Sequence, residues 1–149
     1  MFHYKKKIII LFFLSFLVLY NNKVLSNTLS VSIQKENIIY QFSTKIAKTN
    51  KDREKGLMFV EALDAFEGML FFFSEDKIAN FWMKNTKIFL DLIFINEEKT
   101  IIKIIKNVRP LSEKIYSSGI PVRYVLEIKG GMSEKLKIRT GDILNFEEL

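Results

Sequence analysis

The sequence contains no cysteine, and its single histidine is His3, close to the N-terminus. Residues 27–149 therefore lack the usual ligands of a zinc site, and they have no Ser-His or Cys-His nucleophile and no histidine acid or base. Any catalysis there has to use carboxylates, lysine, tyrosine or hydroxyl groups. The lack of cysteine also excludes disulfide bonds and a lipid-modified N-terminal cysteine.

Residues 1–26 have the composition of a secretory signal. They include three lysines at positions 5–7, and the thirteen residues 8–20 are apolar except for Ser15. Val24-Leu25-Ser26 then offers small or apolar residues where a signal peptidase cuts. Because a transmembrane helix needs about 20 apolar residues, we expect a cleaved signal, with an uncleaved N-terminal anchor as the alternative. The sequence thus predicts a periplasmic or secreted protein.

Residues 27–149 are long enough for one domain with a substantial hydrophobic core. The whole chain has 23 basic and 17 acidic residues, but four of the lysines lie in residues 1–26, which leaves 19 basic against 17 acidic residues, a formal charge of +2. This charge does not indicate a nucleic-acid partner. We expect a monomer that binds no nucleic acid and meets a membrane only through residues 1–26, if they are not removed.

Short segments that alternate between apolar and polar residues fill this domain. Strands are predicted at residues 29–33, 38–49, 68–73, 81–83, 90–95, 100–108, 124–128 and 143–146. Short helices are predicted at residues 51–55, after an N-cap at Thr49 or Asn50, and at residues 132–136, whereas residues 74–80 and 111–121 have the composition of polar loops. About eight strands with one or two short helices predict a mainly β, single-domain sandwich or barrel.

Several sequence blocks follow one another along this domain. The first two are Thr49–Met58 (TNKDREKGLM) and Gly68–Phe71 (GMLF), and the third is Phe81–Thr86 (FWMKNT), followed by Leu90-Asp91 and Phe94-Ile95. The later blocks are Pro110, Val125-Leu126-Glu127 and Gly141-Asp142. From about Ile38 to Phe146, the chain resembles domain-of-unknown-function family 192, a family of small exported bacterial proteins.

The resemblance implies a compact, jelly-roll-like β domain that is usually exported, and it implies no reaction. Two positions differ from the family pattern. Val60 stands where the family usually has arginine, which weakens any anion binding at that point. Phe89 stands where the family usually has proline, which suggests an altered entry to the following strand.

The stretch Phe81–Asn96 holds the only tryptophan, Trp82, next to a polar turn and a lone acid. Aromatic faces beside amides and carboxylates are how β domains often hold sugars, because the ring stacks while the polar groups bind hydroxyls. The predicted ligand site consists of Trp82, Met83, Lys84, Asn85, Thr86 and Asp91, with Arg53, Met58 and Glu127 as neighbours. Phe71, Phe81 and Tyr116 are candidates for an aromatic platform with Trp82. The alternative places Trp82 in the core, where Phe71–Phe73 are expected.

Asp91 and Glu127 are the candidate catalytic residues because both acids lie within apolar strands. A buried carboxylate must be hydrogen-bonded or paired, or its pKa rises. Asp91 is either a ligand-binding acid or general base, or a structural acid that accepts backbone N–H bonds or pairs with Arg53 or Lys84. Glu127 faces either solvent or a polar cavity.

No metal or cofactor is predicted. Asp142 is expected to make a local Asx-type turn, although a hard-cation site would be open if it met the other two acids. A calcium loop of the DxDxDG kind is absent from the sequence. Met58, Met69 and Met83 have thioethers that suit Cu(I), but methionine is more often a core residue, and the lack of histidine argues against copper.

Three functional hypotheses follow from these patterns. The leading one is an exported domain that binds a small polar or carbohydrate-like ligand, or a cell-envelope partner, without catalysis. The first alternative is a carboxylate-based hydrolase with Asp91 and Glu127 about 5–10 Å apart across an open cleft. The second is a structural or assembly protein with no small-molecule site.

Overall fold

Strands dominate this protein, and the computed structural model describes them over residues 28–147. The strands are β1 Thr28–Lys35, β2 Ile38–Ala47, β3 Glu67–Phe81, β4 Leu90–Ile95, β5 Ile101–Val108, β6 Tyr116–Lys129 and β7 Ile143–Phe146. The helices are α2 Asn50–Lys55 and α3 Met132–Lys135. The predicted signal or anchor at residues 1–26 lies outside the described residues. Within residues 28–147, the helices are too short to cross a membrane.

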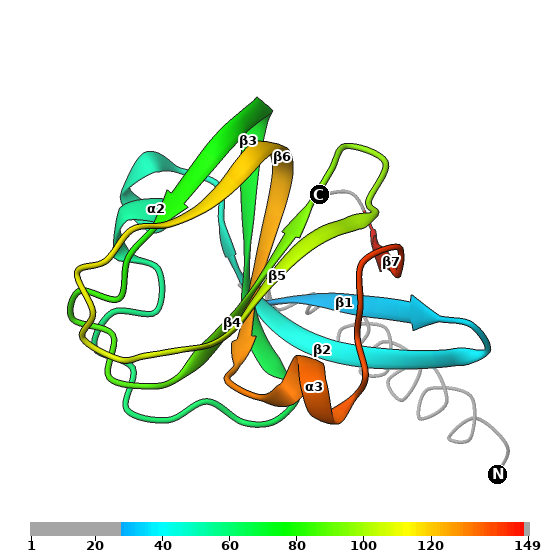
Figure 1. The fold of residues 1–149 in the computed structure, drawn as a ribbon, viewed down its shortest axis with the longest axis horizontal. Helices are drawn as coiled ribbons and strands as arrows, with labels where there is room; N and C mark the ends of the chain where they lie inside the picture. Colours follow the sequence, from blue (N-terminus) through cyan, green and yellow to red (C-terminus); the bar gives the residue numbers. More distant parts are fainter. Residues whose placement is uncertain (1–27, 148–149) are drawn as a thin grey trace, which may run out of the picture.

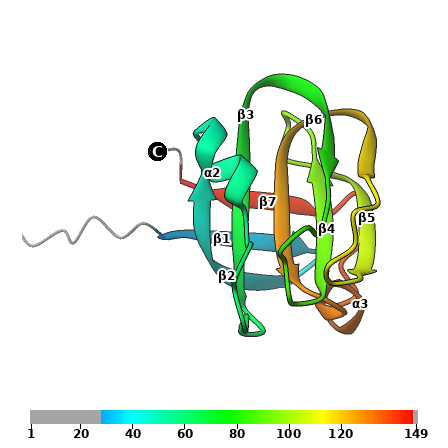
Figure 2. The ribbon, with the colours of Figure 1, turned by 90° about the vertical axis from the view of Figure 1, so that its left-hand side faces the viewer.

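The seven strands of residues 28–147 form one sheet in the order β5-β4-β6-β3-β2-β1-β7. Neighbouring strands are antiparallel, except that β2 and β3 run parallel. The two ends of the sheet meet where Thr100 bridges Ile143 and the Ile101 N–H donates to the Asp142 carbonyl at 2.9 Å. The sheet therefore curls into a half-barrel, and β1 and β2 run across the direction of β3 and β6 (Figures 1 and 2). The prediction of a mainly β domain is confirmed.

The hydrophobic core has two parts, one on each face of the central strands. Leu70 and Leu126 belong to the first part, which β1, β2 and β7 help to enclose. Their chain neighbours Phe71 and Val125 belong to the second part, which the connection at residues 57–63 helps to cover. Successive residues of a strand point to opposite faces, so the central strands are buried on both sides. This is why all six residues of β4 are buried.

Two predicted loops are strands in the structure. Residues 74–80 belong to β3 and residues 116–121 to β6, and the two segments pair with each other. Their polar composition was misleading because a strand needs only a backbone partner, and many of these side chains are exposed. A register shift between Phe72 and Lys77 accompanies the sharp bend of β3 in Figure 2. The eight predicted strands become seven because β3 takes up two of them.

Strands β3 and β6 approach each other closely at Gly68, which is paired with Ile128. A Cβ atom added to Gly68 would lie 2.4 Å from the carbonyl oxygen of Glu127. Because this oxygen belongs to the backbone, it cannot move aside without disturbing the ladder of hydrogen bonds. We predict that Gly68→Ala lowers the free energy of unfolding by about 1–3 kcal/mol, measured by urea denaturation.

The matched control is Ser74→Ala, at an exposed position of the same strand. It should change the free energy of unfolding by less than about 0.5 kcal/mol. If Gly68→Ala were as stable as the wild type, the close approach of β3 and β6 would be wrong.

Candidate functional site

Helix α2 is fixed by its N-terminal cap and by one arginine. Thr49 is the N-cap, as predicted, and its hydroxyl donates to the Asp52 carboxylate at 2.6 Å while accepting the Asp52 N–H at 3.1 Å. The hydrogen bond from the hydroxyl lowers the pKa of Asp52. The Arg53 guanidinium donates to the carbonyls of Lys48 and Phe72, the latter at 2.8 Å. Since Phe72 lies in β3, Arg53 ties α2 to the sheet.

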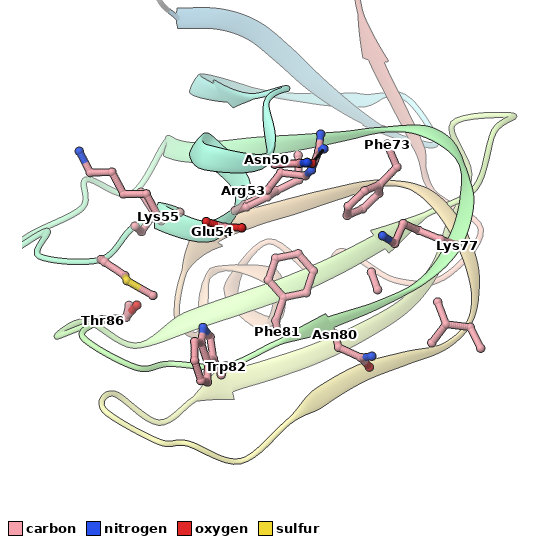
Figure 3. Close-up of a pocket in the computed structure, with 16 residues that line it drawn as sticks. Asn50, Arg53, Glu54, Lys55, Phe73, Lys77, Asn80, Phe81, Trp82 and Thr86 are labelled. Carbon is pink, nitrogen blue, oxygen red and sulfur yellow. Dashed lines mark hydrogen bonds between the residues drawn. The ribbon is translucent and has the colours of Figure 1, made fainter.

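A pocket of about 400 Å³ opens between α2 and the bent part of β3 (Figure 3). Three parts of the chain line it: α2 with the residues directly after it, both ends of the bent part of β3, and Trp82 and Thr86 beyond β3. The lining consists of Asn50, Arg53, Glu54, Lys55, Gly56, Leu57, Met58, Phe71, Phe73, Lys77, Ile78, Ala79, Asn80, Phe81, Trp82 and Thr86.

Aromatic side chains form the apolar part of the pocket. Phe81 packs edge-on against Phe71, with the ring centroids 5.0 Å apart. Trp82 is 44% exposed and is therefore not a core residue. Phe73, expected in the core, is only partly buried and lines the pocket. Tyr116 lies outside the lining, so the predicted aromatic platform is made without it.

Polar groups of both charges accompany these rings. Glu54 points from α2 towards Phe81 (Figure 3). The Lys77 ammonium lies 5.6 Å from the centre of the Phe73 ring, and the Asn80 amide lines the same pocket. Neither Glu54 nor Lys77 forms an ion pair with another residue of the described range. The pocket thus offers stacking surfaces together with an anion, a cation and amide groups.

Four of the predicted ligand residues line this pocket: Arg53, Met58, Trp82 and Thr86. The guanidinium of Arg53 already donates to two backbone carbonyls, so this residue supports the pocket wall. Met83 is only 1% exposed and lies in the second part of the core. It is therefore a core residue and not a ligand residue.

Lys84 and Asn85 lie beside the pocket and contact residues of its lining. The Lys84 ammonium is 5.1 Å from the centre of the Trp82 ring. The Asn85 side-chain amide donates to the Met58 sulfur at 4.0 Å. These two predicted residues therefore contact Trp82 and Met58 from outside the pocket.

Glu54, Phe73, Lys77 and Asn80 line the pocket but were not predicted from the sequence as site residues. Residues 74–80 were expected to form a loop, which hid the continuation of β3. Simple alternation along the strand would not have identified the lining, because residues 77–82 are consecutive and all line the pocket. The register shifts after Phe72 and Ile78 interrupt the alternation there.

The Asp91 carboxylate is fully buried and joins β4, β5 and the start of α3. Its Oδ1 accepts the N–H groups of Asn107 at 2.6 Å and Gly131 at 2.9 Å, and its Oδ2 accepts the N–H of Ser133 at 2.7 Å. This is the arrangement expected of a structural acid that accepts backbone N–H bonds, which was the alternative to a ligand-binding role for Asp91. The residue does not line the pocket, so its place is in the fold and not in the ligand site.

Glu127 is also buried, in β6 between Met69 of β3 and Leu92 of β4. Its Oε2 has no hydrogen-bond partner within the described residues, and burial raises the pKa of Glu127 to about 8. The side chain is buried, so the expectation that it faces solvent is wrong, and it does not line this pocket. Asp91 and Glu127 therefore do not flank the open pocket as a hydrolytic pair.

The candidate metal ligands are dispersed. Asp142 accepts the Arg139 N–H at 2.9 Å, a local hydrogen bond. Met69 and Met83 are in the core, and only Met58 lines the pocket. Within residues 28–147, His, Cys, Asp and Glu side chains form no group of three or more that could hold a metal ion.

A second hollow of about 510 Å³ lies near residues 61–63, residues 87–89 and the end of β6. None of the predicted ligand residues lines it, and Phe89 is the only aromatic residue that lines it within residues 28–147. The ion pair between Lys87 and Glu61 joins two of its walls. The pocket beside α2 is therefore the stronger candidate for a binding site.

Comparison with known proteins gives a family and a fold. Residues 31–146 match the family DUF192, described as an uncharacterized ACR. The chain is similar to a candidate transcription regulator from Sinorhizobium meliloti 1021, whose crystal structure is known, with 35% sequence identity and a TM-score of 0.78. The similarity covers 80% of this chain and 93% of that one. It is also similar to a protein of unknown function from Novosphingobium aromaticivorans DSM 12444, with 34% identity, a TM-score of 0.77, and coverage of 79% and 84%. No curated protein matches the chain.

We predict that Asp91→Asn lowers the free energy of unfolding by about 2–4 kcal/mol. The neutral amide replaces a charged acceptor, and its NH₂ group has to face backbone N–H donors. Urea denaturation measures the change, with Asp64→Asn at an exposed position as the control. Equal midpoints for Asp91→Asn and the wild type would rule out the three-donor arrangement.

Glu127 should make stability depend on pH. Its ordinary pKa is 4.5 and its pKa in the folded protein is about 8, so between these values the folded state binds more protons than the unfolded state. The stability that this protonation contributes is present in full below the lower value, falls as the pH rises, and is lost above the higher value. Across this window, the wild type should lose on the order of 4 kcal/mol through this group.

Glu127→Gln should flatten this pH dependence because the amide does not titrate. Urea denaturation at about pH 5 and about pH 8 tests the prediction, with Glu98→Gln in the exposed β4–β5 turn as the control that should keep the slope. A slope that survives Glu127→Gln unchanged would assign it to other groups.

Proposed function

The chain belongs to the DUF192 family, which is described as uncharacterized, and from its own residues we propose that it is a binding domain for a small, carbohydrate-like ligand. The observation that supports this most directly is the half-exposed Trp82 in a pocket that also contains Phe73, Phe81 and charged and amide side chains. The pocket's volume, about 400 Å³, lies in the range of small-molecule sites.

The arrangement suits a ring with one apolar face. The C–H face of a sugar would stack on Trp82 or Phe81, since aromatic faces take apolar surface without requiring hydrogen bonds. The Asn80 amide would then donate to or accept from the sugar hydroxyl groups, and the Glu54 carboxylate would accept from them. The Lys77 ammonium, without an ion-pair partner in the described residues, would favour a ligand that also bears a carboxylate.

We propose binding without catalysis. The two acids considered for hydrolysis, Asp91 and Glu127, do not line the pocket, and the Asp91 oxygens accept three backbone N–H groups. Among the described residues, Glu54 is the one carboxylate in the lining, and a glycosidic mechanism uses two.

We also propose that the protein acts as a monomer outside the cytoplasm, on a ligand or partner of the cell envelope. The composition of residues 1–26 supports the compartment. The Sinorhizobium meliloti relative is described as a candidate transcription regulator, but the charge of this chain does not favour a nucleic-acid partner. Residues 27–149 have nearly balanced charge, 19 basic against 17 acidic residues, which gives little electrostatic affinity for nucleic acid.

Titration of Trp82 fluorescence tests the proposed site, because Trp82 is the only tryptophan. The panel is glucose, N-acetylglucosamine, glucuronic acid and N-acetylmuramic acid. We expect at least one sugar to shift the Trp82 emission and to reduce its quenching by acrylamide, and the effect should be largest for an acidic sugar. No change with any sugar of the panel would count against the proposal.

Variants then locate the contact. Lys77→Ala should weaken binding of an acidic sugar by about tenfold, or about 1.4 kcal/mol. Lys106→Ala, at an exposed position of β5 outside the pocket, should leave the affinity unchanged. Equal losses in the two variants would indicate a general charge effect instead of a contact in the pocket.

A further inference from the structure

Three connecting segments meet at one end of the half-barrel, on the left in Figure 1. They are residues 57–61, 82–87 and 109–115, and together we call them the loop platform. Backbone hydrogen bonds join them: Phe59 N–H to the Asn85 carbonyl at 2.9 Å, Leu111 N–H to the Thr86 carbonyl at 3.0 Å, and Met83 N–H to the Ser112 carbonyl at 2.8 Å. The middle segment thus holds the other two.

The loop platform exposes four large apolar side chains. Phe59 and Leu111 are each 63% exposed, Ile115 is 55% exposed and Trp82 is 44% exposed. Single exposed apolar residues are common on protein surfaces. Four on three adjoining segments form a concentration of the kind that marks an interaction site.

Two of these side chains belong to residues with an unfavourable backbone conformation. Phe59 has φ +65° and Leu111 has φ +58°, both in the left-handed region. For a residue other than glycine, this region costs about 1 kcal/mol or more. The hydrogen bonds from the two N–H groups to residues 85 and 86 hold the geometry in place. Such strain is typical of segments that present side chains for function.

Basic residues are interleaved with these apolar ones. Lys84, Lys87, Arg109 and Lys114 lie on the loop platform, against only Glu61 and Glu113. Lys87 is paired with Glu61, and Lys84 lies over the Trp82 ring. The surface is therefore positive between its apolar side chains.

We infer that the loop platform docks on an anionic lipid surface, with Phe59, Leu111, Ile115 and Trp82 entering the headgroup region. Tryptophan with a neighbouring lysine suits this region, because the ring takes the apolar side and the ammonium meets phosphate. Basic residues next to inserted apolar ones add attraction to anionic lipids. A protein partner fits less well, since the centre of a protein interface is depleted in lysine.

Docking in this way would bring the pocket next to the lipid surface. Met58 and Trp82 belong to the loop platform and also line the pocket. The pocket therefore opens beside the side chains that contact lipid. The inference does not depend on the proposed ligand, since its observations are the exposure, backbone geometry and charge of the loop platform.

The fluorescence of Trp82 in the full chain tests the inference. Because Trp82 is the only tryptophan and lies in the loop platform, its signal reports lipid near the platform. All variants compared below keep residues 1–27 unchanged, so differences between them come from the substituted side chains. The vesicles contain equal amounts of phosphatidylglycerol and brominated phosphatidylcholine, or brominated phosphatidylcholine alone.

We expect the Trp82 emission to shift to the blue and to be quenched by bromine on the mixed vesicles, with weaker effects on the neutral ones. The difference in quenching between the two kinds of vesicle should disappear at high salt. Emission unchanged from buffer, or equal quenching on both kinds of vesicle, would overturn the inference. A blue shift that grows with protein concentration without vesicles would assign the surface to a second copy of the chain and would also overturn it.

Matched variants separate the loop platform from general hydrophobicity. The double variant Phe59→Ser, Leu111→Ser should reduce the quenching to less than about half of the wild-type value. The control is Ile38→Ser with Ile39→Ser in the β1–β2 hairpin, where the two residues are 50% and 66% exposed. It lies on the other side of the molecule in Figure 1 and should keep full quenching.

A third variant tests the charge. Lys84→Gln with Lys114→Gln keeps the apolar side chains and should reduce quenching on the mixed vesicles while leaving the neutral ones unchanged. Far-ultraviolet circular dichroism establishes that each variant is folded. If the loop-platform variants kept the wild-type signal, or if the control variant lost as much as they did, the inference would be wrong.

Discussion

The pairing of β3 with β6 is the constraint on which both the core and the pocket depend. Up to Phe72, the two strands form the middle of the sheet, and Leu70 and Phe71 enter opposite parts of the core. Beyond the register shift after Phe72, β3 bends, and its outer part forms one wall of the pocket. The Phe72 carbonyl accepts a hydrogen bond from Arg53 at this shift. The irregularity that bends the strand therefore also fixes the helix on the opposite side of the pocket.

The two buried acids show how differently the same chemical group can be accommodated. Asp91 is surrounded by donors, with three backbone N–H groups within 2.9 Å, and it joins two strands to a short helix. Glu127 lies among apolar side chains, keeps one oxygen without a partner in the described residues, and has its pKa raised to about 8. In sequence the two look alike, each flanked by apolar residues of a strand. Their environments differ because the donors to Asp91 lie 16, 40 and 42 residues further along the chain.

Features that depend on neighbouring residues could be predicted from the sequence. Strands β1, β2, β4 and β5 lie close to their predicted ranges, and Thr49, one of the two predicted N-cap residues, is the cap. The outer parts of β3 and β6 were missed because their order comes from pairing between distant segments, while many of their side chains face solvent. The candidate site likewise contains residues that could be predicted from the sequence and residues that could not. Trp82, Thr86 and Met58 belong to recognisable motifs, whereas Lys77 and Asn80 reach the pocket only because β3 continues past its polar stretch.

The parallel pairing of β2 with β3 makes one connecting segment part of two surfaces. Parallel neighbours cannot be joined by a tight turn, so the chain must cross back through a long connection, here residues 48–66. The connection contains α2, Met58 and Phe59, and its residues Leu57 and Leu63 enter the second part of the core. The buried leucines hold the connection against the sheet, so one wall of the pocket and one apolar side chain of the loop platform belong to the same anchored segment. Ligand binding that shifted this segment would therefore also shift part of the surface proposed to meet lipid.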